Sequence, residues 1–318
     1  MQGNKKLSTK AQVLKTLRQA SARLSGKELS SALNVSRTSI WKAVQSLQEC
    51  GYKIDAQKNG YLLTDNFFDS IMPFEFENNE KQFVHYFKIE STMIEARKIA
   101  LAALEGGGPT ATIITADEQS AGKGRGSHLW KTTSGSLAFT MINAQKIPLY
   151  KSARLTMAAQ IALANVLERM TGRPFYARWP NDVWSKDGKV AGILDEAFSS
   201  GGLCCFLNLG IGVNVSQSPK IPKAAKVFDK KIPHARKKIL SDFINEFSKM
   251  KSLAEQETNA LQKIWNKMNY DCGKKIRAAG ANDYIFDSID PNGWAILKNT
   301  INGAKTKFAP GSVSYEKR

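Results

Sequence analysis

The sequence predicts a mixed α/β (α+β) chain in three parts: an N-terminal winged helix-turn-helix, a central domain with a mixed sheet, and a small C-terminal β-barrel. Three observations support this division. Helical periodicity and then a hairpin signal occupy residues 1–65, strand and helix patterns mix over 83–268, and short β-like runs between glycine turns occupy 269–318. Residues 66–82 are expected to form a linker. A chain of 318 residues is long enough for two or three domains.

The composition is that of a globular protein. Hydrophobic residues make up 42% of the chain, and neither a signal-like apolar run at the start nor an 18-residue apolar stretch occurs. Cys50, Cys204, Cys205 and Cys272 lack the spacing of a metal site. We therefore expect a soluble, cytoplasmic chain with reduced cysteines, no membrane partner and no protein cage for a metal.

Positive charge is clustered in the sequence. The formal net charge is +18, and residues 1–65 carry eleven Lys/Arg against four Asp/Glu, while residues 217–240 carry eight against one. Clusters of this size favour a polyanionic or acidic partner. A generally basic proteome would give the same average, so that alternative stays open.

The N-terminal part begins with three helix signals. Leu14 and Leu17 share a face of the first helix, Ser25 to Glu28 has the form of a capping box that opens the second, and Ser36 can cap the third. Asn59-Gly60 is then expected to be the two-residue turn of a hairpin, which would form a wing.

A helix-turn-helix followed by a basic wing is typical of DNA-binding domains, because the last helix fits the major groove while wing lysines meet phosphate. The residues expected to contact DNA are Arg37, Thr38, Lys42, Gln45, Lys53 and Lys58. A small helical module for protein contacts would have a similar pattern and remains the alternative.

Patterning also places the elements that follow. The linker contains four aromatic rings through which it should pack: Phe67, Phe68, Phe74 and Phe76. Strands are expected at 112–116, 137–141, 190–197 and 203–209, and helices at 152–170 and within 237–268. The expected turns lie at Ser199–Gly202, Gly273, Gly280, Pro291–Gly293 and Asn302-Gly303.

The stretch Gln119–Ser127 holds three glycines and two cations and is followed by Trp130. Glycine lets a backbone approach a ligand closely, and Lys123 and Arg125 would favour an anion there. An exposed, solvated basic turn is the alternative. Three more motifs accompany this loop: Glu90-Ser-Thr92, Arg178–Asp182 with Lys189–Leu194, and Gly210–Asn214.

These motifs, in this order, resemble the biotin protein ligases. With the winged helix and the small barrel, which would be SH3-like, the whole chain resembles the bifunctional bacterial type, a ligase that also represses transcription of the biotin operon. The resemblance implies that biotin and Mg-ATP form biotinyl-5'-AMP, and that a lysine of a biotin carboxyl carrier protein domain then attacks it. It also implies operator DNA as a partner and a homodimer when the adenylate is bound.

The resemblance assigns roles to residues. Arg125, Lys189, Asp182 and Arg178 would be catalytic, with Asp182 helping to deprotonate or orient the acceptor lysine. The biotin-binding set would be Ser91, Thr92, Met93, Gln119, Lys123, Gly124, Arg125 and Lys189. The adenylate-binding set would be Gly122, Lys123, Arg125, Trp130, Asn181, Gly192 and Asn214, and the loop would close over the biotinyl phosphate.

The chain departs from the family pattern in four places. Met93 replaces the asparagine of Ser-Thr-Asn, Lys123 replaces the first loop arginine, and Arg178 stands where lysine is common. Charge is kept, so activity should survive, while tight retention of the adenylate comes into doubt. Gly126-Ser-His128 also differs from the usual loop end, and His128 is assigned no role. The basic stretch 217–238 would order the nucleotide, attract an acidic carrier, or be merely solvated.

Three alternatives remain at this stage. The chain could be a sensing repressor with little transferase activity, although intact Lys189 and Arg125 argue against that. It could be a lipoate or octanoate transferase, although such enzymes rarely carry a winged helix. It could also be a ligase whose winged helix no longer represses, because its basic residues would bind DNA nonspecifically in any case.

Overall fold

The structure is a computed structural model, and it describes residues 7–66, 68–104, 106, 112–200, 203–256, 258–277 and 283–310. Phe67, Gly201, Gly202 and Gly280, which the sequence places in the linker and in turns, lie outside the described residues. The chain divides into two units, residues 1–85 with 233–237 and residues 86–232 with 238–318. In the described part, no helix combines the length and apolar character needed to cross a membrane.

The first unit opens with three capped helices, α1 (Thr9–Gln19), α2 (Gly26–Leu33) and α3 (Arg37–Glu49). The predicted capping box is confirmed: the Glu28 amide donates to the Ser25 hydroxyl, and the Ser25 amide donates to the Glu28 carboxylate. The apolar faces meet in one core that includes Leu14, Leu17, Leu29, Ile40 and Leu47. Local capping and helical periodicity therefore suffice to specify this part.

The wing is a hairpin of β1 (Ile54–Gln57) and β2 (Gly60–Leu63). Gln57 pairs with Gly60, so the two-residue turn is Lys58-Asn59, and the predicted turn at Asn59-Gly60 is wrong by one residue. The reason is tertiary. Gly60 has φ +130°, and a Cβ there would collide with the Leu24 carbonyl, which accepts a 2.8 Å hydrogen bond from the Tyr61 amide.

Residues 66–82 are not irregular throughout, because they contain two 3-10 helices, η1 (Pro73–Glu75) and η2 (Glu77–Gln82). Glu75 is the polar centre of the unit. Its fully buried carboxylate accepts two 2.7 Å hydrogen bonds from Arg18 and one of 2.8 Å from Lys237, and it contacts the Tyr52 hydroxyl. Burial opposes its ionisation, but the hydrogen bonds and charges of Arg18 and Lys237 outweigh burial and lower the pKa of Glu75 to about 2.

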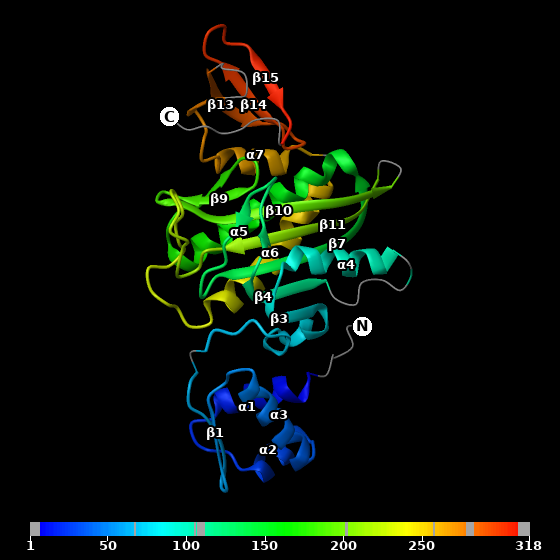
Figure 1. Cartoon of the computed structure of the whole chain (residues 1–318), viewed down its shortest axis with the longest axis vertical. Helices are drawn as coiled ribbons and strands as arrows, with labels where there is room; N and C mark the ends of the chain where they lie inside the picture. The colour runs from blue at the N-terminus through cyan, green and yellow to red at the C-terminus, as the bar shows by residue number, and fades with distance from the viewer. Residues whose placement is uncertain are drawn as a thin grey trace. The chain divides into compact units, whose positions relative to one another are not determined.

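A seven-stranded sheet organises the second unit, in the order β3-β4-β7-β11-β10-β9-β8 (Figure 1). The pairings from β4 to β8 in this order are antiparallel. The bounds are β3 Phe83–Ile89, β4 Ile113–Gln119, β7 Leu137–Pro148, β8 Tyr176–Arg178, β9 Asp182–Ser185, β10 Gly188–Ser200 and β11 Leu203–Val213. The four strands expected from the sequence are confirmed with longer bounds, whereas β3, β8 and β9 were not expected.

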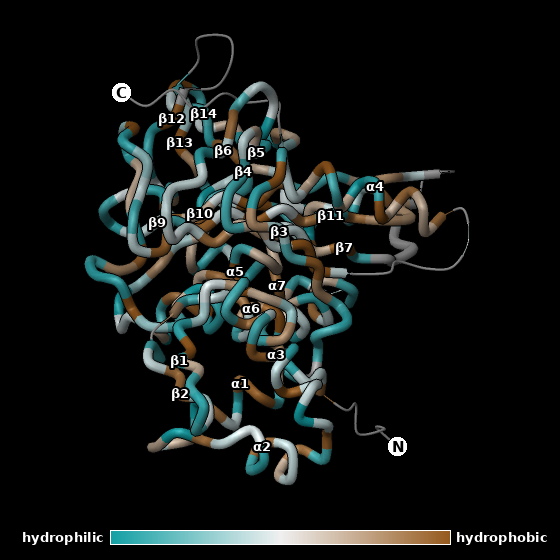
Figure 2. The backbone as a smooth tube through the Cα atoms, turned by 60° about the horizontal axis from the view of Figure 1, so that its bottom comes forward, coloured by the Kyte–Doolittle hydropathy of each residue, from teal (hydrophilic) through white to brown (hydrophobic). Residues whose placement is uncertain are grey.

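Helices cover both faces of this sheet. On one face, Ala96 and Ala100 of α4 (Thr92–Leu104) pack with residues of β4, β7 and β11, where Figure 2 shows brown, hydrophobic segments. On the other face lie α5 (Ser152–Thr171), which follows η3 (Leu149–Lys151), and α6 (Ala235–Glu255), whose Phe243 meets Phe139 of β7 edge to face. Helix α7 (Ala260–Lys267) packs on α5.

The chain ends in a four-stranded antiparallel sheet of β12 (Lys275–Arg277), β13 (Asp283–Ile289), β14 (Ala295–Asn299) and β15 (Lys305–Phe308). The predicted small C-terminal β structure is thereby confirmed as a sheet. It is tied to the central sheet by Trp179, whose indole N–H donates to the Gly293 carbonyl at 2.9 Å.

Candidate active site

A cavity of about 1020 Å³ opens on the α4 face of the large sheet. It collects all the residues that the resemblance assigns to biotin, adenylate and catalysis except one. Those that line it are Ser91, Thr92, Met93, Gln119, Lys123, Gly124, Arg125, Trp130, Arg178, Asn181, Asp182, Lys189, Gly192 and Asn214. The exception is Gly122, which pairs with Trp130 in a two-stranded ribbon and is not among the lining residues.

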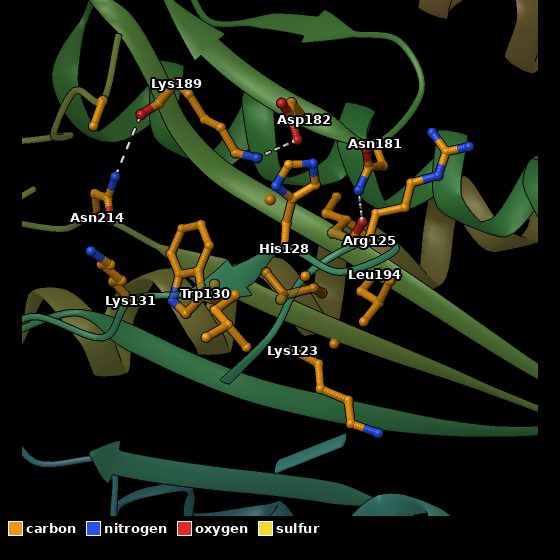
Figure 3. Close-up of a pocket in the computed structure, with 18 of the residues that line it drawn as sticks. Lys123, Arg125, His128, Trp130, Lys131, Asn181, Asp182, Lys189, Leu194 and Asn214 are labelled. Carbon is orange, nitrogen blue, oxygen red and sulfur yellow. Dashed lines mark hydrogen bonds and ion pairs between the residues drawn. The ribbon is translucent and has the colours of Figure 1, made fainter. Parts of the chain in front are cut away.

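The glycine loop is a tight hairpin formed by β5 (Gly122–Lys123) and β6 (Leu129–Trp130). Its tip is held by two backbone hydrogen bonds, from the Gly124 amide to the His128 carbonyl at 2.9 Å and from the His128 amide to the Arg125 carbonyl at 3.2 Å. A side chain at Gly124 would approach the His128 carbonyl to 2.9 Å. The loop therefore presents its side chains at the cavity from a fixed turn (Figure 3).

Trp130 rests on the glycines of the sheet. A Cβ at Gly212 would clash with the indole, 2.3 Å from its Cε2, and one at Gly192 would contact its Cζ3 at 3.4 Å. The indole Nε1 is buried and has no hydrogen-bond partner among the described residues. A buried donor without a partner is costly, so this N–H is available to a polar group of a ligand.

At the start of α4, the side chain of Gln119 meets the Ser-Thr motif. The Thr92 amide and hydroxyl donate to the Gln119 side-chain carbonyl at 2.8 and 3.1 Å, and the Thr140 hydroxyl lies 2.9 Å from that of Thr92. Met93 covers Gly210, where a Cβ would come within 2.5 Å of the Met93 sulfur. The departure at Met93 thus fills space over the sheet with an apolar side chain rather than an amide.

Lys189 and Asp182 form an ion pair inside the cavity. The Lys189 Nζ lies 2.7 Å from Asp182 Oδ1, and both side chains are mostly shielded from solvent. Gly192 is the residue paired with Asp182, and a Cβ there would approach the Lys189 Nζ to 3.2 Å. The glycine therefore leaves room for the lysine to reach back along the ladder to the carboxylate.

Arg178 is the most constrained cation of the site. Its Nε donates to Asp271 at 2.7 Å, and its guanidinium lies 4.2 Å from the centroid of the Trp184 ring. Both charged side chains are almost fully buried. Nearby, burial lowers the pKa of Lys274, an effect that Asp271 opposes and Arg178 reinforces. Because its charge is paired with Asp271, Arg178 is suited to a structural role, in which it fixes the part of the cavity lining that includes Trp184.

A segment after β11 forms one rim, and we call residues 219–228 the strap. The Lys189 amide donates to the Lys223 carbonyl at 2.7 Å, and the Ala225 amide donates to the Lys189 carbonyl at 2.8 Å. Asn214 supports the strap from the sheet, since its Nδ2 lies 3.0 Å from the Ala225 carbonyl. Asn214 Oδ1 is buried without a partner among the described residues.

The cavity is strongly cationic. Its described lining contains the six cations Lys123, Arg125, Lys131, Arg178, Lys189 and Lys223, and one carboxylate, Asp182. In the described part of the chain no group of three His, Cys, Asp or Glu could hold a metal ion. Lys131 and His128 also line the cavity but were not among the predicted site residues, whereas Lys223 lies in the basic stretch 217–238, for which ordering of the nucleotide was one expectation. For Lys131 and His128, their place beside the glycine loop was the available signal.

The first unit carries a second, more open cavity of about 490 Å³ between α3 and the wing. Arg37, Thr38 and Lys58, all predicted to contact DNA, line it, and all six predicted contact residues are exposed. Trp41 also lines it, and its side chain is 49% exposed. A large exposed aromatic on the outer face of α3 was missed by sequence reasoning, which treated helical positions there as polar or basic.

Comparisons with known proteins agree with this architecture. Residues 9–62 match an HTH domain, and residues 90–214 match the Biotin/lipoate A/B protein ligase family. A bifunctional ligase/repressor BirA of Bacillus subtilis is 30% identical over 209 residues, which cover 62% of this chain and 61% of that protein. Its counterpart in Bacillus spizizenii is 26% identical over 310 residues, covering 90% and 92%.

The fold is also that of a solved structure. The biotin protein ligase from Aquifex aeolicus in complex with biotin and ATP superposes with a TM-score of 0.59 at 22% identity, covering 75% of this chain and all of that one. At this identity the likeness concerns the fold alone. Together, these findings show that the chain carries an HTH domain followed by a domain of the Biotin/lipoate A/B protein ligase family, and that it is similar to the bifunctional ligase/repressor proteins of Bacillus.

Proposed function

We propose that this chain joins biotin to ATP as biotinyl-5'-AMP and transfers the biotinyl group to a lysine of a biotin carboxyl carrier protein domain. The observation that carries the proposal is the cationic cavity, in which the glycine loop, the Lys189–Asp182 pair and Trp130 face one space. Its volume of about 1020 Å³ suits a ligand the size of an adenylate. The names of the Bacillus relatives and the ligands of the Aquifex structure support the same reaction.

In the first step, a biotin oxygen attacks the α-phosphorus of ATP and pyrophosphate leaves. Negative charge grows on the phosphoryl oxygens, and positioned cations and amides stabilise it. Lys123 and Arg125 would meet these oxygens, and Lys189, oriented by Asp182, would hold the biotin carboxylate. Ser91, Thr92 and Gln119 would bind the ring end of biotin through their polar groups, which line the cavity and of which those of Thr92 and Gln119 are hydrogen-bonded to one another.

Trp130 and the strap would receive the nucleotide. The unpartnered indole N–H offers a donor, and the exposed strap residues, including Ile221 and Lys223, could cover an adenine ring. In the second step Asp182 would orient the acceptor lysine through its negative charge. Magnesium would enter with ATP, held mainly by phosphate oxygens, because the one lining carboxylate is already paired with Lys189. There it would neutralise charge on the leaving pyrophosphate.

We propose that the winged helix represses transcription by binding operator DNA, with α3 in the major groove and the wing against phosphate. As the family works, biotinyl-5'-AMP would favour a homodimer whose two winged helices bind a two-fold operator. We place these reactions in the cytoplasm, where ATP, carrier protein and operator DNA occur together.

The decisive experiment incubates the purified chain with biotin, Mg-ATP and a biotin carboxyl carrier domain and follows acceptor mass. An increase by one biotinyl group supports the proposal. Formation of biotinyl-5'-AMP without transfer would instead make the chain a sensing repressor. Sedimentation and operator binding, each measured with and without the adenylate, test the proposed repressor. If the adenylate left both the mass in solution and the affinity for the operator unchanged, the proposed link between adenylate, dimer and DNA binding would be wrong.

A further inference from the structure

Transfer of the biotinyl group requires a proton acceptor. At neutral pH the acceptor lysine is an ammonium ion, and its nitrogen has no free electron pair until a proton leaves. A base positioned in the cavity would accelerate this step. The identity of that base rests on the proposed function, in which this chain itself catalyses the transfer.

The described lining offers two candidates. Its six cations cannot accept a proton while charged, which leaves Asp182 and His128. The Asp182 carboxylate is engaged by the Lys189 ammonium at 2.7 Å. A carboxylate is also ordinarily a weaker base than an imidazole. Asp182 is therefore suited to orienting a cation, and His128 is the remaining base.

The position of His128 fits this role. Both backbone polar groups of the residue are hydrogen-bonded within the loop, to Gly124 and Arg125, so the side chain leaves the loop in a defined direction. In Figure 3 the imidazole of His128 points toward the Asp182–Lys189 pair. The residue is exposed, so an incoming lysine can reach it from solvent and it can release a proton there.

The charged side chains that line the cavity together with His128 come from several elements. Lys123, Arg125 and Lys131 extend from its own hairpin, Asp182 and Lys189 from strands β9 and β10, Arg178 from the end of β8, and Lys223 from the strap. Cations dominate this set, and Asp182 is the one carboxylate in it.

We propose that His128 is the catalytic base of the transfer step. Its imidazole takes one proton from the acceptor ammonium and passes it to solvent. The neutral amine attacks the acyl carbon of biotinyl-5'-AMP, the C–N bond forms, and the bond from that carbon to the phosphate oxygen breaks. AMP leaves with the electron pair, and the second proton lost by nitrogen goes to AMP or solvent.

The test separates the two half-reactions. Single-turnover transfer from preformed biotinyl-5'-AMP to a biotin carboxyl carrier domain is measured from pH 5 to 9, and adenylate formation is followed by pyrophosphate release. His128→Gln should slow transfer about 100-fold at pH 7.5 and should remove the rise in rate that an imidazole base gives between pH 5 and 8. Adenylate formation should change less than about threefold.

Two further variants exclude a structural role. Free imidazole should restore part of the transfer rate of His128→Ala, which a merely packing role would not allow. His85→Gln, a histidine outside the cavity, should keep the wild-type pH profile. Because His128 is exposed, its variants should fold as the wild type does.

Three results would overturn the role of His128. Transfer by His128→Gln with the wild-type rate and pH profile would overturn the inference and leave the proposed function standing. A loss confined to adenylate formation would also overturn it and make His128 a phosphate contact. If the wild type itself formed no adenylate and transferred no biotin, the proposed function and this inference would fail together.

Discussion

The Lys189 Nζ lies 2.7 Å from the Asp182 carboxylate, beside Gly192, which is opposite Asp182 in the β9–β10 ladder and where a Cβ would come within 3.2 Å of the Nζ. We expect Lys189→Gln to slow adenylate formation by at least about 100-fold, since a positioned cation is lost where charge develops. Biotin-dependent exchange of pyrophosphate into ATP measures this step. Unchanged exchange would exclude Lys189 from the first half-reaction.

Asp182→Asn removes the partner of Lys189 but keeps the shape of the side chain. We expect a smaller loss in adenylate formation, about tenfold, together with slower transfer from preformed biotinyl-5'-AMP. The two half-reactions are measured separately on the same preparation. An Asn variant with normal adenylate formation and normal transfer would refute an orienting role for Asp182.

Gly212→Ala tests the seat of Trp130. The new methyl group would overlap the indole and push the β5–β6 hairpin away from the sheet. We predict that dissociation of biotinyl-5'-AMP becomes about tenfold faster, which corresponds to about 1.4 kcal/mol. Fluorescence or filter binding gives the rate, and a double-mutant cycle with Trp130→Ala should show that the two effects are not additive. Additive effects would mean that Gly212 acts otherwise.

Glu75→Gln tests the buried polar centre of the first unit. The folded-state pKa of Glu75, about 2, lies below its ordinary value of 4.5, so its contribution is full above 4.5 and disappears as pH falls toward 2. We expect the substitution to lower the free energy of unfolding at pH 7 by about 3 kcal/mol and to flatten its pH dependence in that window. Hydrogen exchange of α1 and α3 amides measures it.

A matched control for Glu75 is Glu77→Gln. Glu77 pairs with Lys15, and both side chains are about half exposed. Screening by water makes such a pair weak, so the change should be below about 1 kcal/mol. Equal effects of the two substitutions would contradict the assignment of Glu75 as the centre.

Substitutions in the winged helix should distinguish electrostatic from aromatic contacts with DNA. Arg37→Ala and Lys58→Ala should each reduce the slope of log affinity against log salt by about 1, because each removes a phosphate contact. Trp41→Ala should weaken binding to operator DNA without changing that slope. Titrations at several salt concentrations give both quantities. A slope that falls equally with Trp41→Ala would show that the tryptophan acts by displacing its basic neighbours.

Elements with strong local signals could be predicted from the sequence. The capping box at Ser25 and Glu28, the repeat along α3, and the apolar runs of β7 and β11 all follow from contacts within a few residues. Strands β8 and β9 are three and four residues long and contain polar side chains, so no periodicity marks them. They are stabilised by their neighbours in the sheet, because β9 pairs with β10 and β8 pairs with β9.

The site was predictable as a set of motifs but not as a set of contacts. Arg178 was expected to face phosphate, yet its partner Asp271 lies 93 positions away in the chain. Likewise, Glu75 pairs with Lys237 across 162 positions. Long-range pairing depends on how elements pack, which local pattern does not encode. His128 was assigned no role because a single histidine in a loop is more often a surface residue than a catalyst, and only its place beside the glycine loop pointed to the site.

The strap holds Lys189 by its backbone on both sides: its amide donates to Lys223 and its carbonyl accepts from Ala225. The Lys189 amide proton therefore reports whether the strap is hydrogen-bonded to β10. If the strap lifts to admit a nucleotide, the Lys189 proton loses its acceptor and should exchange with solvent at the frequency of that opening. The exchange rate of this amide proton then measures how often the strap opens for a ligand, and binding of the adenylate should slow the exchange.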